Sequence, residues 1–307
     1  MNHERIKRLQ ELFIALCDLD TQTGLTSSPP KKTKAGTVYL TDPGVILVAR
    51  PQQEYRRKED MRRFLYDLDP TFEPYADEEG GLHDGAALAK LAGQLCYLSF
   101  GPKRTMNADA EKYFQNILSS GHGSVLEHAN FSFLIYGVSR SFTHELVRHR
   151  AGCAYSQVSQ RYVDKPRFVE RAEYQKDPGL HEMFERWIDR SMEEYESRAA
   201  ALIALQETDG GTLSAETKTE RRKKVNQSAR ECLPNETEAP IVFTGNVRAL
   251  RHVIGMRASK HADTQIREVF VRIFLILALI EPVLFMDGEV ETLPDGTHGV
   301  VFQYPKV

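Results

Sequence analysis

The residues best suited to chemistry lie in one stretch, RHRAGCAYSQVSQRY, at positions 148–162. Arg148, His149 and Arg150 stand side by side, and hydroxyl, amide and guanidinium groups follow toward the end of the stretch. Arginine forms bidentate hydrogen bonds with phosphates and with planar oxygen acceptors. The stretch therefore indicates a site for phosphorylated, planar ligands, at which a bound cofactor would supply the reactive group.

Three further clusters mix cations with polar groups. They are GHGSVLEHANF (121–131), SARECLP (228–234) and GNVRALRHVIGMRASKHADTQIR (245–267). Each also has a purely structural explanation: a helix-to-strand turn, a cation at the C-terminal end of a helix, and a solvated basic helix face. Considered singly, the first two clusters are better explained by a structural role than by a functional one. For the third cluster the two explanations are equally good.

Several common active sites are not supported by the spacing. His144-Glu145 begins like HExxH, but the next histidine, His149, is five residues on, which places it ~140° away around a helix. We therefore predict no metal site. The chain contains no GxSxG nucleophile motif, no Walker A motif and no Rossmann fingerprint after a predicted strand. A flavin or nicotinamide would have to bind by another fold.

The composition is that of a globular protein with 307 residues, a net charge of -3, 41% apolar residues and 27% charged residues. This balance disfavours a protein that binds nucleic acid or an anionic membrane surface. The four cysteines show no CxxC spacing, and no secretory signal is recognisable at the N-terminus. We expect free thiols, a reducing compartment and a cytoplasmic protein.

Periodicity and breaker residues predict an α+β protein in which helices outnumber strands. A linker is expected at 26–36, a two-strand edge at 37–40 and 45–49, and irregular structure at 51–85. Helices are expected at 1–18, 86–100, 108–122, 139–150, 180–205, from Ser214 to about 232, and at 246–258 and 262–281. Strands are expected at 129–138 and 239–246. Ser139 is the predicted N-cap of the helix that leads into the 148–162 stretch.

Together the four clusters resemble the flavin-dependent thymidylate synthase family. The family signature, RHR, seven residues, Ser and x-Arg-Tyr, is similar to residues 148–150 and 159–162. The family's His-x-Ser/Thr-x-x-Glu-His resembles 122–128, and its Arg…Leu-Pro resembles 230–234. Its Asn-x-Arg and Arg-x-x-x-His resemble 246–248 and 257–261. Four motifs in the family's order cover roughly residues 86–281, which is far more specific than any one of them.

The resemblance implies helices around a central, mainly antiparallel sheet, and a homotetramer that binds FAD at subunit junctions. It implies C5 methylation of a uridylate, dUMP or UMP, with 5,10-methylenetetrahydrofolate as carbon donor and NADPH as reductant. The predicted FAD contacts are Ser124, Arg148, His149, Arg150, Asn246, Arg248 and His261, with His122 near the flavin and folate stacking site. The predicted nucleotide phosphate and sugar contacts are Ser159, Gln160, Arg161 and Arg230. Arg257 is predicted to contact and polarise the uracil ring.

Two departures from the family pattern bear on the nucleotide. Eight residues, not seven, separate Arg150 from Ser159, which predicts a longer loop between the two ligand sites. His144-Glu145 stands where the family often has Arg-Gln; a carboxylate there would repel a phosphate but could accept hydrogen bonds from a ribose. Both residues are therefore included among the predicted substrate contacts, and the departures motivate the hypothesis that UMP is methylated as well as dUMP.

Two other functions remain open from the sequence. The same arginines would suit a non-enzymatic nucleotide-binding or RNA-binding protein, and a flavoprotein could oxidise NADPH without methyl transfer. Ser159 has no evident activating base, so a phosphate contact is favoured over a nucleophilic role. We divide the chain into an N-terminal extension and linker, 1–36, and a single catalytic domain, 37–307.

Overall fold

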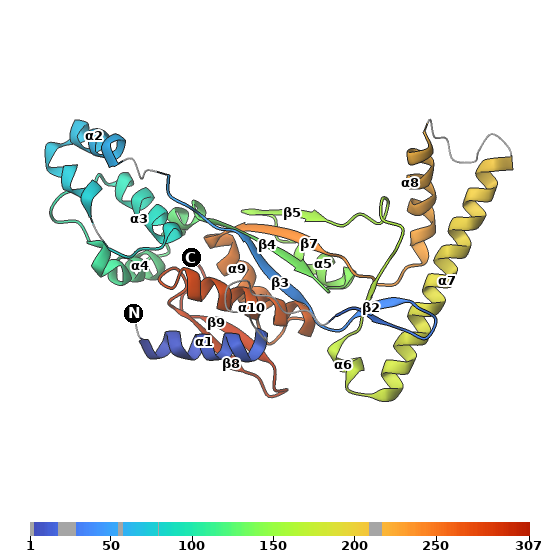
Figure 1. Ribbon diagram of the computed structural model, residues 1–307. Coiled ribbons are helices and arrows are strands. Elements are labelled where there is room, and N and C mark those ends of the chain that lie inside the picture. The colour runs from blue at the N-terminus through green and yellow to red at the C-terminus, as the bar shows by residue number, and fades with distance from the viewer. Residues whose placement is uncertain (1–2, 18–28, 55–57, 79, 209–216) are drawn as a thin grey trace.

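A four-stranded antiparallel sheet forms the centre of the protein in the computed structural model, which describes all residues except 1–2, 18–28, 55–57, 79 and 209–216 (Figure 1). Its strand order is β3 (Gly44–Ala49), β4 (Asn130–Tyr136), β7 (Ile241–Asn246) and β5 (Cys153–Gln157). Along β4 the side chains of Phe131, Phe133 and Ile135 are buried while their neighbours are not. This alternation is the period-two pattern of a strand with one face on the core.

Two consecutive helices, α9 (Val247–Arg257) and α10 (Thr264–Ile280), pack against this sheet (Figure 1). Residues 265–267 and 269–278 of α10 are all buried, because the helix is apolar on several sides. A hairpin of β8 (Gly288–Thr292) and β9 (His298–Phe302) follows, and α1 (His3–Cys17) packs along α10. Arg5 ties α1 to the hairpin region by donating to the carbonyl oxygens of Phe285 and Gly288 at 2.9 and 2.7 Å.

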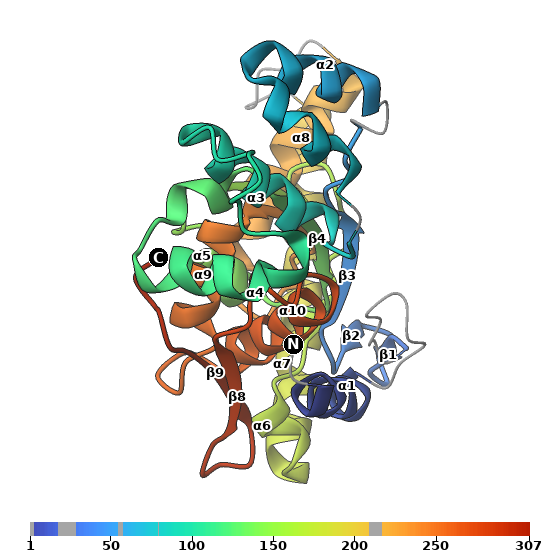
Figure 2. The same ribbon diagram turned by 90° about the vertical axis from the view of Figure 1, so that its left-hand side faces the viewer.

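One end of the molecule is helical and comprises α2 (Lys58–Leu68), η1 (Pro70–Asp77), α3 (Asp84–Cys96), η2 (Asn107–Asp109), α4 (Ala110–Ser119) and η3 (Gly123–Glu127) (Figures 1 and 2). A buried charge cluster holds this end together. Arg104 Nε lies 2.9 Å from Glu78 Oε2, and Lys90 Nζ donates to Asn107 Oδ1 at 2.7 Å. Burial of these charges is tolerated because each has a partner.

The opposite end is an antiparallel pair of helices, α7 (Pro178–Thr208) and α8 (Lys218–Ala229), preceded by α6 (Ala172–Gln175) and followed by η4 (Arg230–Cys232) (Figure 1). A small sheet of β1 (Lys31–Lys32), β2 (Val38–Leu40) and β6 (Phe168–Val169) packs at its base. Tyr39, Phe168, Phe184 and Ile188 form a second core between this sheet and α7. The long helices are thus anchored at one end only.

The structure confirms most elements that were strongly periodic in the sequence. Helices α1, α3, α4, α7, α9 and α10 and strands β4 and β7 lie where they were predicted, within a few residues. The helix α5 (Arg140–Leu146) begins after Ser139, whose Oγ accepts a hydrogen bond from Phe142 N at 3.3 Å. It ends four residues before Arg150, so the RHR residues follow the helix instead of belonging to it.

Four predictions were wrong. The segments at 37–40 and 45–49 do not pair with each other, because β2 joins the small sheet and β3 joins the central one. The predicted linker contains the short strand β1. The region 51–85, predicted to be irregular, contains α2, an amphipathic helix between prolines whose Leu65 side chain is buried. Strand β5 was missed because its pairing partner is distant in the sequence. Residues 209–211 and Ser214 lie outside the described residues, and α8 is capped by Thr217 instead.

No helix within the described ranges is long and apolar enough to cross a membrane.

Glu281, at the end of α10, offers a test of how the helical end is attached to the core. The residue is buried, and its carboxylate accepts hydrogen bonds from Gly85 N and Ala86 N, at the start of α3, at 2.8 and 3.0 Å. Burial raises its pKa to about 7, although the two backbone hydrogen bonds oppose the shift. The nearby charges of Asp84 and Arg50 act in opposite directions.

Because the folded pKa exceeds that of the unfolded chain, stability from this group is present below pH ~4.5 and declines as the pH rises through about 7. We expect Glu281→Gln to remove that decline. Urea unfolding at pH 5, 6.5 and 8 measures it, with Glu291→Gln, an exposed carboxylate on β8, as the control. Parallel pH profiles for the wild type and Glu281→Gln would show that Glu281 does not titrate in this range.

Candidate active site

The RHR residues lie in the connection between α5 and the edge strand β5. Cys153 N donates to Arg150 O at 3.3 Å, which closes a tight turn through Ala151 and Gly152. Gly152 has a φ of +69°, and a Cβ there would lie 2.6 Å from Asn246 Nδ2, so glycine is needed for both reasons. Because β5 begins at Cys153, the predicted longer loop is wrong: most of the eight intervening residues belong to a strand paired with β7.

Arg257, the last residue of α9, is the centre of the most ordered polar group in this region. Its Nη1 donates to Glu145 Oε2 at 2.6 Å, and its Nη2 donates to the Glu145 carbonyl oxygen at 3.0 Å. Its Nε donates to His149 Nε2 at 2.8 Å. The carboxylate of Glu145 is therefore balanced by a guanidinium, and Arg257 is held in one orientation by α5 and the residues that follow it.

His149 is kept neutral by its surroundings. Burial and the positive charge of Arg257, followed by His252 and Arg148, lower its pKa to about 4. Since Nε2 accepts the hydrogen bond from Arg257, the ring proton is assigned to Nδ1. Tyr155 fixes the backbone here by donating its hydroxyl to the carbonyl oxygens of His149 and Leu146 at 2.5 and 3.2 Å.

A hollow of about 440 Å³ opens at the N-terminal end of α9. It is lined by Glu127, Ala151, Gly152, Asn246, Arg248, Ala249, His252 and residues 305–307. Asn246 caps the helix by accepting from Ala249 N at 2.8 Å, and Arg248 Nη1 donates to Glu127 Oε1 at 2.6 Å. A helix N-terminus with adjacent cations favours an anion. The lining therefore suits the diphosphate of a flavin dinucleotide.

A second cluster of cations surrounds the end of α8. Arg230 follows the last helical residue, and the predicted nucleotide contacts at 159–161 lie close by, since Asn226 Nδ2 donates to Arg161 O at 3.4 Å. Gln160 Nε2 and Arg161 Nε are buried and have no acceptor among the described residues. Buried donors without acceptors are uncommon in native proteins. These donors would be satisfied by a phosphate.

The structure adds residues to this cluster that the sequence analysis did not select. Burial and the charge of Arg230 lower the pKa of Arg140, which shows that the two guanidiniums are neighbours. The Lys223 ammonium lies 4.9 Å from the centre of the Tyr162 ring. Tyr162 could have been chosen because it ends the quoted motif. Arg140 and Lys223 gave no such signal, because their proximity arises only from packing.

Several of the predicted site residues do not contact the groups described above. Arg148, Arg150 and His144 are exposed, as are His122 and Ser124 on the η3 segment. His261 lies in the turn between α9 and α10 and forms no hydrogen bond or ion pair with another described residue. The hollow is lined by neither Arg257 nor Arg230, so the three groups do not share it.

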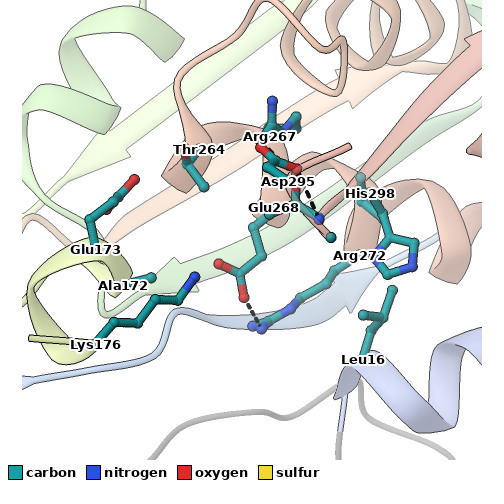
Figure 3. Close-up of a pocket in the computed structure, with 13 residues that line it drawn as sticks. Leu16, Ala172, Glu173, Lys176, Thr264, Arg267, Glu268, Arg272, Asp295 and His298 are labelled. Carbon is teal, nitrogen blue, oxygen red and sulfur yellow. Dashed lines mark hydrogen bonds and ion pairs between the residues drawn. The ribbon is translucent and has the colours of Figure 1, made fainter. Parts of the chain in front are cut away.

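A separate cavity of about 380 Å³ lies between α6, α10 and the β8–β9 turn, and Leu16 of α1 contributes to its lining (Figure 3). It contains none of the predicted site residues. Its three carboxylates, Glu173, Glu268 and Asp295, accompany Lys176, Arg267 and Arg272, and two of the acids pair with arginines of the same cavity. The predicted residues Glu145, His149 and Arg257 contact one another elsewhere, so we take the Arg257 region as the candidate active site.

Comparison with known proteins identifies the family of the chain. Residues 81–283 match the family described as thymidylate synthase complementing protein, Thy1. The flavin-dependent thymidylate synthase of Mycolicibacterium gilvum (strain PYR-GCK) is 43% identical over 230 residues, which are 74% of this chain and 88% of that protein. The enzyme of Mycobacterium avium (strain 104) is 42% identical over 232 residues, which are 75% and 89% of the two chains.

Solved structures share the fold. The UMP/dUMP methylase PolB from Streptomyces cacaoi bound with 5-Br dUMP has a TM-score of 0.52 and 18% identity, and covers 80% of this chain and 94% of that one. The same protein bound with 5-Br UMP has a TM-score of 0.54 and 17% identity, covering 80% and 93%.

The fold, the motifs and the comparisons define a Thy1 protein. The chain belongs to the flavin-dependent thymidylate synthase family, and it is an enzyme of this kind that uses a flavin. The alternative of a non-enzymatic nucleotide-binding protein is thereby set aside.

The contact between Arg257 and His149 can be tested without an activity assay. We expect Arg257→Ala to raise the pKa of His149 from about 4, because one nearby positive charge is removed while the ring stays partly buried. NMR titration of the imidazole resonances measures this, with His149→Gln used to assign the signal. Arg248→Ala, on the same helix but paired with Glu127, serves as control. An unchanged His149 titration in Arg257→Ala would contradict the contact.

Proposed function

We propose that the protein catalyses reductive C5 methylation of a uridylate, with FAD as cofactor, 5,10-methylenetetrahydrofolate as carbon donor and NADPH as reductant. The observation that carries the proposal is that Glu145 and His149 hold Arg257 in one orientation. The same chain has a hollow suited to a dinucleotide and two buried donors without acceptors at 160–161. Relatives that are 41–43% identical are flavin-dependent thymidylate synthases, and a structural neighbour is a UMP/dUMP methylase.

The cofactor would be held by the hollow at the start of α9. Asn246 and Arg248 line it, and the predicted contacts His122, Ser124, Arg148 and Arg150 lie on the segments that include the lining residues Glu127, Ala151 and Gly152. The other two predicted contacts, His149 and His261, lie beside Arg257 and beyond the C-terminal end of α9. When bound, the flavin supplies the redox chemistry of the reaction. Because several of these side chains are exposed in one chain, we propose that a homotetramer completes each site with residues from neighbouring subunits.

The nucleotide phosphate would bind at the Arg230 cluster. Ser159, Gln160 and Arg161 present a hydroxyl, an amide and a guanidinium from one short loop, and Arg230 presents a second guanidinium from the end of α8. A phosphate monoester can accept several charge-assisted hydrogen bonds at once. Binding there would satisfy the buried Nε2 of Gln160 and Nε of Arg161.

Arg257 would then act on the pyrimidine ring. A guanidinium has five N–H groups, and Glu145 and His149 occupy one each on Nη1, Nη2 and Nε, so one N–H remains on each Nη. These groups can donate to a uracil carbonyl oxygen and stabilise the negative charge that develops when carbon or hydride adds to the ring. Neutral His149 accepts a hydrogen bond from Arg257 Nε. It therefore orients the guanidinium and adds no positive charge beside it.

Glu145 would have two effects on the substrate. Its carboxylate keeps Arg257 charged and in place, and its partial exposure leaves it able to accept a hydrogen bond from a sugar hydroxyl. We propose that both dUMP and UMP are accepted on this basis.

Product analysis tests the proposal directly. The purified protein should be yellow, and should form a C5-methylated nucleotide from dUMP and from UMP only when methylenetetrahydrofolate and NADPH are both present. Mass spectrometry of the nucleotide product is the measurement. NADPH consumption without methylated product would indicate an NADPH oxidase instead. A rate with UMP at background would restrict the substrate to dUMP.

The role of Arg257 predicts a specific loss. We expect Arg257→Lys to lower kcat about 100-fold, since a lysine cannot keep Glu145 and His149 while donating to the ring. Nucleotide affinity should change little, because the proposed phosphate contacts lie elsewhere. The control is Arg63→Lys, an exposed arginine on α2. A kcat near that of the wild type would remove Arg257 from the mechanism.

A further inference from the structure

The C-terminal segment, Tyr304–Val307, lies against the proposed flavin site. Pro305, Lys306 and Val307 line the same hollow as Asn246 and Arg248. The contact with the 122–124 motif is close: a Cβ added to Gly123 would lie 2.6 Å from the carbonyl carbon of Val307 and 2.9 Å from Arg248 Nε. The segment is therefore one wall of the hollow and not a projection away from the fold.

Three hydrogen bonds fix the start of this segment. Tyr304 N donates to Asp287 Oδ2 at 3.0 Å, and Tyr304 O accepts from Arg251 Nη2 at 3.2 Å. The Tyr304 hydroxyl accepts from Gln115 Nε2 of α4 at 2.7 Å. These three contacts come from α9, α4 and the turn before β8, so they set the direction in which residues 305–307 leave the core.

The charges of the lining single out Lys306. Arg248 is paired with Glu127 at 2.6 Å, which balances one positive and one negative charge of the hollow. Lys306 is exposed and forms no ion pair with a described residue. Beside the N-terminus of α9, its ammonium adds positive charge, and the side-chain carboxylate of the lining, Glu127, is already paired with Arg248.

We propose that Lys306 is a cofactor-binding residue, which donates to the diphosphate of FAD, and that residues 305–307 form a wall of the flavin site. The inference rests on the proposed position of the flavin. It concerns a segment beyond the four sequence motifs and beyond residues 81–283, where the family match ends.

Titration of flavin-free protein with FAD, followed by flavin fluorescence, tests the proposal. We expect Lys306→Gln to raise the Kd for FAD about three- to fivefold, as for loss of an exposed charge pair, and to weaken its dependence on salt. Lys306→Arg should retain affinity within about twofold. Lys31→Gln, on strand β1 at the other side of the molecule, is the matched control (Figure 2).

A second measurement uses no variant. Saturating FAD should reduce acetylation of Lys306 by acetic anhydride, read by mass spectrometry, while Lys31 is modified at the same rate with and without FAD. Equal Kd values for Lys306→Gln and Lys31→Gln, or tighter FAD binding after deletion of residues 305–307, would overturn the proposal; the latter would show that the segment competes with the flavin. Failure of the wild type itself to bind FAD would instead refute the proposed function.

Discussion

The position of α9, and with it of Asn246, Arg248 and Arg257, depends on the ion pair between Arg251 and Asp287. Both side chains are buried, and two guanidinium nitrogens contact the two carboxylate oxygens at 2.7 and 2.8 Å. Arg251 also donates to Leu284 O at 3.0 Å and lies 4.5 Å from the centre of the Phe302 ring. Such a pair is costly to break once buried, because the remaining charge would have no partner. Its effect is to fix α9 against the chain that follows α10.

Residues of the candidate site lie at both ends of helix α9. Asn246 and Arg248 lie at its start beside the hollow, and Arg257 ends it beside Glu145 and His149. The other half of the site comes from α5 and β5, which the central sheet holds in place through β7. Strand β7 runs directly into α9, so the sheet and the helix share one covalent connection at Asn246. The side chains of the candidate site are thus positioned by two connections of the chain, one after α5 and one after β7.

Local features of this arrangement could be predicted from the sequence, and long-range ones could not. Ser139 as an N-cap and Arg230 at a helix end follow from short-range rules about capping and helix termini. The family resemblance, which comparison with known proteins confirmed, came from motifs that are each contiguous. By contrast, the hydrogen bond between Arg257 and His149 joins positions 108 residues apart, and the periodicity of the sequence does not predict such a contact.

The same limit explains the errors. Strand β5 is short and rich in small and polar residues, and only its pairing with β7 makes it a strand. The extra residue after Arg150 was therefore assigned to a loop. Arg251 was included in a basic helix face that could have been solvated or ligand-binding, whereas the structure buries it against Asp287. The roles of the individual FAD and nucleotide contacts remain predictions, because they concern ligands and neighbouring subunits.

The regular geometry of α9 also fixes the distance between Arg248 and Arg257. Residues 248 and 257 are nine positions apart, which corresponds to roughly 13.5 Å along a helix axis at 1.5 Å per residue. Arg248 at the hollow and Arg257 beside Glu145 and His149 are thus held at a constant separation by one rigid element. Inserting or deleting a single residue within α9 would alter that separation only slightly, but would rotate the two guanidiniums by ~100° relative to each other. Substitutions in α9 are therefore easier to accommodate than changes in its length.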